Sequence, residues 1–174
     1  MTLIQKGHFT LRKCVPSDVD VIAKTMRLHD VRECGMVGVT PRTALLVPFV
    51  EKGASGFTIT HKDKPIAMCG VTPLDKYFRF GRIWFLGTDD IYKIQLSLFK
   101  YSEIVLAFLV KDYEMVENFV PFDHLTNLMW LEWMGFESEE QSYYINEYEF
   151  IRVFYCNLHK FQSNNILSER PVLH

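Results

Sequence analysis

A histidine and two adjacent aromatic residues are, by type alone, the side chains best suited to chemistry or ligand binding. His124 could act as an acid or a base, because an imidazole titrates near neutral pH. It follows Asp123 at an expected helix start, so a helix cap at Asp123 with an exposed His124 is the competing interpretation. Trp84 and Phe85 could form the floor of a pocket, or one of them fills the core.

Two carboxylates, Asp30 and Glu33, lie in the segment "HDVRECGMVG", which is interrupted by Gly35 and Gly38. Taken by themselves, they are best explained by helix capping and by salt bridges within a loop. The histidines show no pair at metal-ligand spacing, and the cysteines are scattered without a CxxC motif. The sequence therefore predicts no metal site.

The elements that must position these residues alternate between strands and helices. Strands are predicted at 8–13, 56–62, 65–74, 82–89, 115–121, 136–141 and 147–156, and helices at 16–30, 41–52, 89–113 and 124–134. A short helical turn and loop is expected at 31–40. Antiparallel strands followed by a strand–helix–strand unit predict an α+β fold, with a mixed, mostly antiparallel central sheet and helices on both faces. One domain is expected over 1–156, followed by a docked or flexible tail at 157–174.

Composition limits the classes of partner. The chain has 174 residues, 48% hydrophobic and 23% charged, with a net charge of −2 and 14% aromatic residues. The absence of a basic excess argues against nucleic-acid binding, and the aromatic content favours a protein partner. The N-terminus has no signal-peptide pattern, and the most apolar stretch, "EIVLAFLV", is too short to span a bilayer.

Several motifs, in their order and spacing, resemble those of the GNAT (Gcn5-related N-acetyltransferase) superfamily. They are "HDVRECGMVG", "PIAMCGV", "IWFLGTDDI" and the closing "N…WLEWMGF", within a resemblance that covers roughly residues 8 to 155. The sequence is most similar to acetyltransferase-like proteins of tailed phages, including internal virion proteins of short-tailed phages. The location implied by this resemblance is the virion or the host cytoplasm.

The GNAT resemblance implies that two neighbouring strands splay and that the pantetheine arm of acetyl-CoA pairs with the exposed edge. These strands are "RIWFLGTD" and "MVENFV". The backbone of Leu86, Gly87 and Thr88 would then bind the pantetheine amides. Asn118 would hydrogen-bond across the splay, although a structural role at the strand edge is an equal alternative.

At the diphosphate end the chain departs from the family. No Q/R-x-x-G-x-G/A motif follows the strand, and Asp89 and Asp90 place negative charge where the diphosphate would bind. Lys93 could offset part of that charge. The tyrosine that commonly protonates the leaving thiolate is also missing, because Leu131 occupies its position.

The resemblance also implies an acceptor pocket around Asp30 and Glu33. In this reading Asp30 and Trp84 bind the substrate, Glu33 or a water acts as the base, and His124 lies where the family often has asparagine. Two functions remain open: acetyl-CoA-dependent N-acetyl transfer to an amine, and a catalytically inactive scaffold. The scaffold would act as a virion protein or bind host proteins, including those of host defence.

Overall fold

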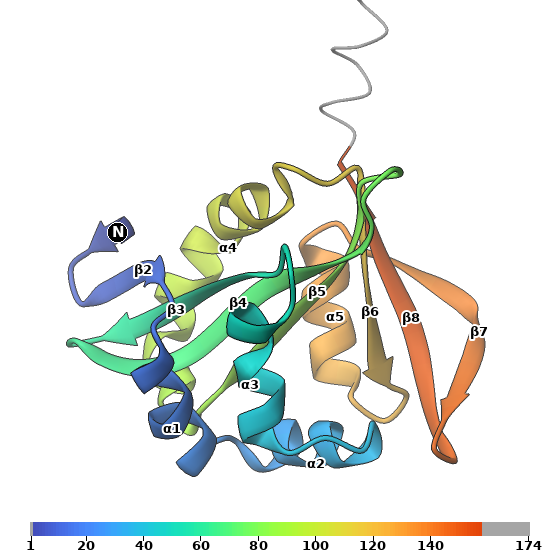
Figure 1. Ribbon diagram of the computed structural model, residues 1–174, viewed down its shortest axis with the longest axis horizontal. Coiled ribbons are helices and arrows are strands. Elements are labelled where there is room, and N and C mark those ends of the chain that lie inside the picture. The colour runs from blue at the N-terminus through green and yellow to red at the C-terminus, as the bar shows by residue number, and fades with distance from the viewer. Residues whose placement is uncertain (1, 158–174) are drawn as a thin grey trace, which may run out of the picture.

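The computed structural model describes residues 2–157. It contains one eight-stranded sheet in the order β1-β2-β3-β4-β5-β6-β8-β7 (Figure 1). The strands are β1 (Thr2–Lys6), β2 (Phe9–Lys13), β3 (Ser55–His61), β4 (Lys64–Asp75), β5 (Phe80–Gly87), β6 (Met115–Pro121), β7 (Glu137–Ile145) and β8 (Tyr148–Cys156). The helices are α1 (Pro16–Lys24), α2 (Leu28–Met36), α3 (Pro41–Val50), the short 3-10 helix η1 (Asp89–Ile94), α4 (Gln95–Val110) and α5 (Leu125–Trp133).

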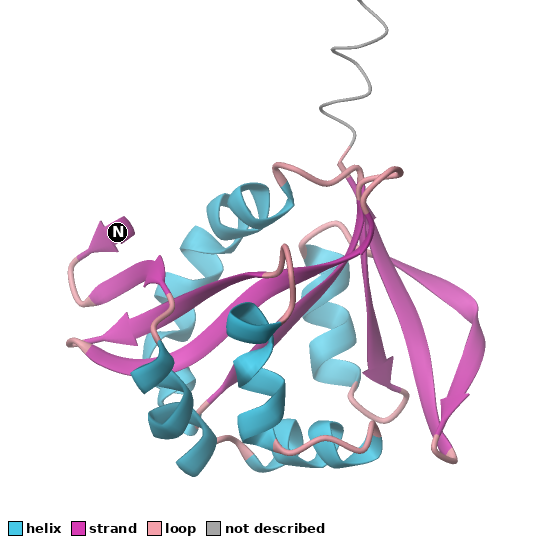
Figure 2. Cartoon of the chain, viewed as in Figure 1, coloured by secondary structure: helices cyan, strands magenta, loops and turns pink. Residues whose placement is uncertain are grey.

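Helices cover both faces of the sheet, as Figure 2 shows. Helices α1 and α3 pack on the front face in this view and bury a small core around Ile22, Leu45 and Met68. Helices α4 and α5 lie behind the sheet over the larger core, which includes Val116 and Val153. All sheet pairs are antiparallel except β5 with β6. The predicted α+β class, with a mostly antiparallel sheet and helices on both faces, is confirmed.

Three local predictions were wrong. The sequence reading missed β1, which pairs with β2 through a hairpin in which Gly7 has a φ of +57°. It expected a turn and loop where α2 forms a continuous helix through Gly35. It also expected one helix from Asp89, where η1 precedes α4. Except for Asn157, the predicted tail 157–174 lies outside the described residues.

Strands β5 and β6 are paired only where they begin. Their register runs from Phe80 with Met115 to Arg82 with Glu117, and beyond this point the two strands diverge, with α5 visible between them in Figure 1. The last pair is held by an ion pair, because Arg82 donates to the buried Glu117 carboxylate at 2.6 Å. Arg152 on β8 donates to the other oxygen of that carboxylate at 2.6 Å. The predicted splayed strand pair is confirmed, and its closed end is fixed by charge pairing.

Candidate functional site

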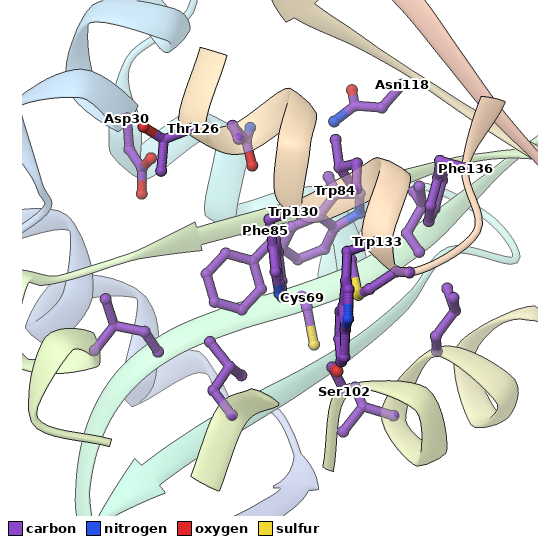
Figure 3. Close-up of a pocket in the computed structure, with 18 of the residues that line it drawn as sticks. Asp30, Cys69, Trp84, Phe85, Ser102, Asn118, Thr126, Trp130, Trp133 and Phe136 are labelled. Atoms are coloured by element: carbon purple, nitrogen blue, oxygen red, sulfur yellow. The ribbon is translucent and has the colours of Figure 1, made fainter. Parts of the chain in front are cut away.

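A cavity of about 550 Å³ lies between the sheet, α4 and α5, on the side where β5 and β6 separate. Its inner wall is apolar and includes Ile59, Leu106 and Leu109. Figure 3 shows Trp84, Trp130 and Trp133 around the middle of the cavity, with Asp30 and Thr126 to one side and Asn118 to another. A mainly apolar cavity with a few polar groups is typical of a small-molecule site.

Helix α2 is attached at two points, to the end of β5 and to the start of α5. On the β5 side, the Asp30 carboxylate accepts a hydrogen bond from the backbone N–H of Gly87 at 2.7 Å. Asp30 also accepts hydrogen bonds from Arg27, from Nε at 3.1 Å and from Nη2 to both carboxylate oxygens at 2.9 Å, and it lies 3.2 Å from His29 Nε2. Asp30 is only 2% exposed, so this cluster is a buried anchor between α2 and the end of β5.

On the β6 side, Glu33 and His124 are brought together although 91 residues separate them. His124 Nδ1 lies 2.8 Å from Glu33 Oε1, and both side chains are partly buried. The expected cap by Asp123 was wrong: His124 itself is at the N-cap position, and Asp123 forms an exposed ion pair with Arg32 at 2.8 Å. The two residues predicted as catalytic therefore form one hydrogen-bonded pair at the cavity mouth.

Electrostatics at this mouth favour neutral forms over charged ones. Burial raises the pKa of the Glu33 carboxyl above its ordinary value, although the hydrogen bond from His124 opposes this rise. Burial and the nearby Arg27 guanidinium lower the pKa of His29, whose ring contacts that of His124 at a centroid distance of 4.7 Å. A carboxyl with a raised pKa in contact with an imidazole can accept and return a proton near neutral pH.

The backbone at the end of β5 is largely committed to the fold. The N–H of Thr88 donates to Ile66 O at 2.8 Å, and Leu86 pairs with Met68 on β4. The N–H of Gly87 is bound by Asp30, and its C=O accepts from the N–H of Arg27 at 2.9 Å. The backbone groups of Leu86 and Thr88 therefore face β4. The N–H and C=O of Gly87, which point away from β4, are already hydrogen-bonded to Asp30 and Arg27.

Alternation along β5 identifies the residues that do face the splay. In an antiparallel pair, the N–H and C=O of successive residues point to opposite sides of the strand. Gly87 directs both groups away from β4, so Phe85 and Ile83 direct theirs the same way, into the gap beyond the last β5–β6 pair. Both residues also line the cavity.

Asn118 and Trp84 line the cavity as well. The Asn118 amide oxygen accepts a hydrogen bond from the N–H of Phe119 at 2.8 Å. Trp84 lies across from Gly70 on β4, where an added Cβ would approach the indole to 2.7 Å. Phe119 packs against Tyr143 and lies outside the cavity lining, so the gap is bordered by Trp84 and not filled by Phe119.

In the segment after β5, the acidic residue Asp90 forms ion pairs with two lysines. Asp90 accepts from Lys64 at 2.7 Å and from Lys93 at 2.6 Å. These two hydrogen bonds lower the pKa of Asp90 to about 2, so it stays ionised at neutral pH. Lys93 is thus held by Asp90 within η1, and it is not among the cavity-lining residues.

Sequence reasoning missed two polar contributors, Arg27 and His29, and it favoured core packing or a protein-binding patch for Trp130, which lines the cavity. Trp130 packs edge-on against Phe85 with ring centroids 6.1 Å apart. The Trp130–Trp133 spacing on one helix was visible in the sequence, but it fits a core face equally well. Arg27 and His29 carried no signal, because their roles depend on contacts across the fold. Among the described residues, no cluster of acids, histidines and cysteines could hold a metal ion.

Comparison with known proteins shows the fold. No family model matches the chain, and no curated protein matches it in sequence. Among solved structures, a spermidine N-acetyltransferase variant from Vibrio cholerae superposes with a TM-score of 0.63 at 12% identity, covering 91% of this chain and 99% of that one. A proposed acetyltransferase gives 0.67 at 12% identity, with 97% and 96% covered. A proposed ribosomal-protein-serine acetyltransferase from Vibrio cholerae gives 0.62 at 13% identity, with 90% and 97% covered. The chain has the GNAT fold.

Proposed function

We propose that this chain is an N-acyltransferase that moves an acyl group from a pantetheine thioester to an amine. The observation that carries the proposal is the Glu33–His124 pair at the mouth of a cavity that opens where β5 and β6 separate. This pair can manage a proton, and the strand edge next to it can bind an extended amide chain. Similarity of fold to acetyltransferases supports the proposal.

The acyl-pantetheine part of acetyl-CoA fits the residues present. Ile83 and Phe85 would bind the pantetheine amides through their backbone, in place of Leu86, Gly87 and Thr88, and Asn118 faces the same cavity. The diphosphate does not fit in the family's manner, because Asp90 holds both lysines and adds negative charge. When bound, the thioester supplies an activated acyl group.

The residues of this chain would handle the acceptor and its proton. Glu33 accepts the Nδ1–H of His124, which leaves Nε2 available to take a proton from the acceptor ammonium. The amine nitrogen then forms the new bond to the acyl carbon, the C–S bond breaks, and the leaving thiolate takes the second proton that the nitrogen loses. The acceptor is either a small amine, such as the polyamine of one structural neighbour, or an amine of a protein.

The test is a transfer assay with acetyl-CoA and with S-acetyl-N-acetylcysteamine, using spermidine and amine-bearing peptides as acceptors and mass spectrometry as the readout. We expect acylated product, with kcat/KM reduced about 10²- to 10⁴-fold in Glu33→Gln and His124→Gln. Asp123→Asn is the matched control, because Asp123 precedes the pair but is exposed. No product from either donor, or full activity in both variants, would refute the proposal.

A non-catalytic scaffold is the second candidate. Two observations favour it: Lys64 and Lys93 are already paired with Asp90 where a diphosphate would bind, and apolar residues are exposed along α5. Leu125, Met129 and Trp133 recur at four-residue spacing and are 65%, 70% and 54% exposed. A partner protein, in a phage virion or in a host cell, would cover this face. Pull-down from both sources compares the chain with a Met129→Lys variant, and capture of the same protein by both would contradict this candidate.

A further inference from the structure

Charge is distributed unevenly along the chain. The first 111 residues contain sixteen lysines and arginines and ten acidic residues, whereas residues 112–151 contain ten acidic residues and no lysine or arginine. Four of these acids lie on the β7–β8 hairpin and form no salt bridge within residues 2–157: Glu137, Glu140, Glu147 and Glu149. This end of the molecule is therefore strongly negative, although the net charge of the whole chain is only −2.

Strand β7 is also an open edge of the sheet. It pairs only with β8, and Figure 1 shows no described element on its other side. Both residues of the connecting turn, 146 and 147, have a positive φ, the geometry of a two-residue hairpin in which Ile145 and Tyr148 form a hydrogen-bonded pair. Alternation then directs the backbone N–H and C=O of Ser142 and Tyr144 outward. No other described group bonds to them, so another extended chain can pair there.

The side chains on this edge match a basic partner. Tyr144 and Tyr148 are 70% and 47% exposed, on the same hairpin as the four glutamates. An exposed tyrosine ring attracts a lysine or arginine through a cation–π interaction, and an unpaired carboxylate attracts it by charge. The same glutamates oppose pairing of β7 with β7 of a second copy, because that would bring like charges together across the strands. The surface therefore favours a segment rich in lysine or arginine.

The hairpin reaches the Glu33–His124 pair at its turn. The side-chain amide of Asn146 donates a hydrogen bond to the C=O of Met36, at the end of α2, at 3.1 Å. Met36 lines a small hollow of about 60 Å³ together with Glu33 and His124. An extended chain on β7 therefore has one end near the two residues that would take the proton from the acceptor.

We propose that the outer edge of β7 binds an extended, basic segment of a protein by strand addition, and that this protein carries the acceptor amine. The acceptor class rests on the proposed function, because it decides between a small amine and an amine of a protein. The docking itself requires no catalysis and holds for a non-catalytic chain as well.

Docking can be observed directly on the outward backbone groups. The probe is the peptide Lys-Val-Lys-Val-Thr-Val-Lys-Val, N-acetylated and C-amidated, and the control probe has Glu in place of each Lys. In ¹H–¹⁵N correlation spectra of the full chain, recorded without an acyl donor, we expect the amide signals of Ser142 and Tyr144 to move with the lysine peptide alone. Equal binding of both peptides, or shifts confined to other parts of the chain, would overturn the proposal.

Two kinds of variant separate strand addition from general attraction of charge. Ser142→Pro removes an outward N–H but no bond to β8, and should weaken the lysine peptide about tenfold, whereas the matched control Ser142→Ala should change binding less than twofold. Replacement of Glu137, Glu140 and Glu147 by Gln should weaken it about fivefold to twentyfold at low salt, and less at high salt. Urea midpoints show that each variant is folded. Unchanged binding in the glutamine variant, or in a folded proline variant, would contradict the assignment.

The outcome can be told apart from that of the transfer assay. Peptide binding without any acyl transfer would refute the proposed function and its acceptor, and leave the docking surface standing. Transfer to spermidine without binding of the lysine peptide would do the reverse. A dimer in sedimentation velocity that Ser142→Pro dissociates would assign the edge to a second copy and overturn this inference.

Discussion

Asp30 and Asp90 are the same residue type with two basic neighbours each, and they have opposite effects on the site. Asp30 is buried, and it joins Arg27, His29 and the backbone of Gly87 into the anchor that holds α2 at the end of β5. Asp90 lies at the more exposed end and holds Lys64 and Lys93, whose side chains are 57% and 66% exposed. One acid fixes α2 at the end of β5, and the other pairs with the two lysines that lie nearest to it after that strand.

The difference teaches that burial, not charge count, decides what a carboxylate contributes here. The loss of Asp30 leaves Arg27 and the N–H of Gly87 unpaired, whereas the loss of Asp90 leaves two lysines that water can solvate, because their side chains are 57% and 66% exposed. The three predictions that follow test this contrast.

The largest effect is expected on stability at Asp30. Asp30→Ala should lower the free energy of unfolding by about 3 to 5 kcal/mol, because it strands a buried guanidinium and a buried N–H. Asp90→Ala, the matched control, should change it by less than about 1 kcal/mol. Urea denaturation of both variants measures the difference. Similar losses in the two would show that the contrast is wrong.

An effect of intermediate size is expected on the affinity for acetyl-CoA when Asp90 is replaced. Asp90→Asn should strengthen acetyl-CoA binding about threefold to tenfold, because it removes a negative charge and releases two lysines. The gain should fade in high salt. Isothermal titration compares acetyl-CoA with S-acetyl-N-acetylcysteamine, which should not respond to the substitution. A gain for both ligands would place the effect elsewhere than at the diphosphate.

The smallest effect is expected in the pH dependence of stability at Glu33. Folding raises the pKa of this carboxyl, so as pH rises the unfolded chain loses its proton first, and stability falls until the folded pKa is passed. Glu33→Gln removes that loss. At pH 7 its Tm should exceed that of the parent chain by about 2 to 4 °C. The difference should vanish below about pH 4, where Glu33 is protonated in both states. A Tm gain independent of pH would contradict the assigned pKa direction.

The sequence predicted the regular elements better than the site. Alternation and helical periodicity located most strands and helices, because those patterns follow from which face is buried. Helix α2 was missed because Gly35 and Gly38 weaken a local helix, while the anchor at Asp30 and the burial of Cys34 stabilise it from outside the segment. The missed strand β1 has one local signal, Gly7, whose positive φ allows the turn into β2.

The candidate site depends on contacts that no local pattern encodes. Glu33 and His124 were each selected, but their hydrogen bond arises only when α2 lies beside the start of α5. The sequence suggested that the backbone of Gly87 binds a ligand, but its N–H donates a hydrogen bond to Asp30, a contact between distant residues that the sequence does not reveal.

The divergence of β5 and β6 after three residue pairs also bears on how this protein can change through evolution. The gap is made by the backbone and is fixed at its closed end by the ion pairs of Glu117 with Arg82 and Arg152. Rim residues such as Met129 and Phe99 are largely exposed, so replacing them alters what the cavity selects at little cost to folding. Ligand preference can therefore drift by single substitutions while the scaffold persists.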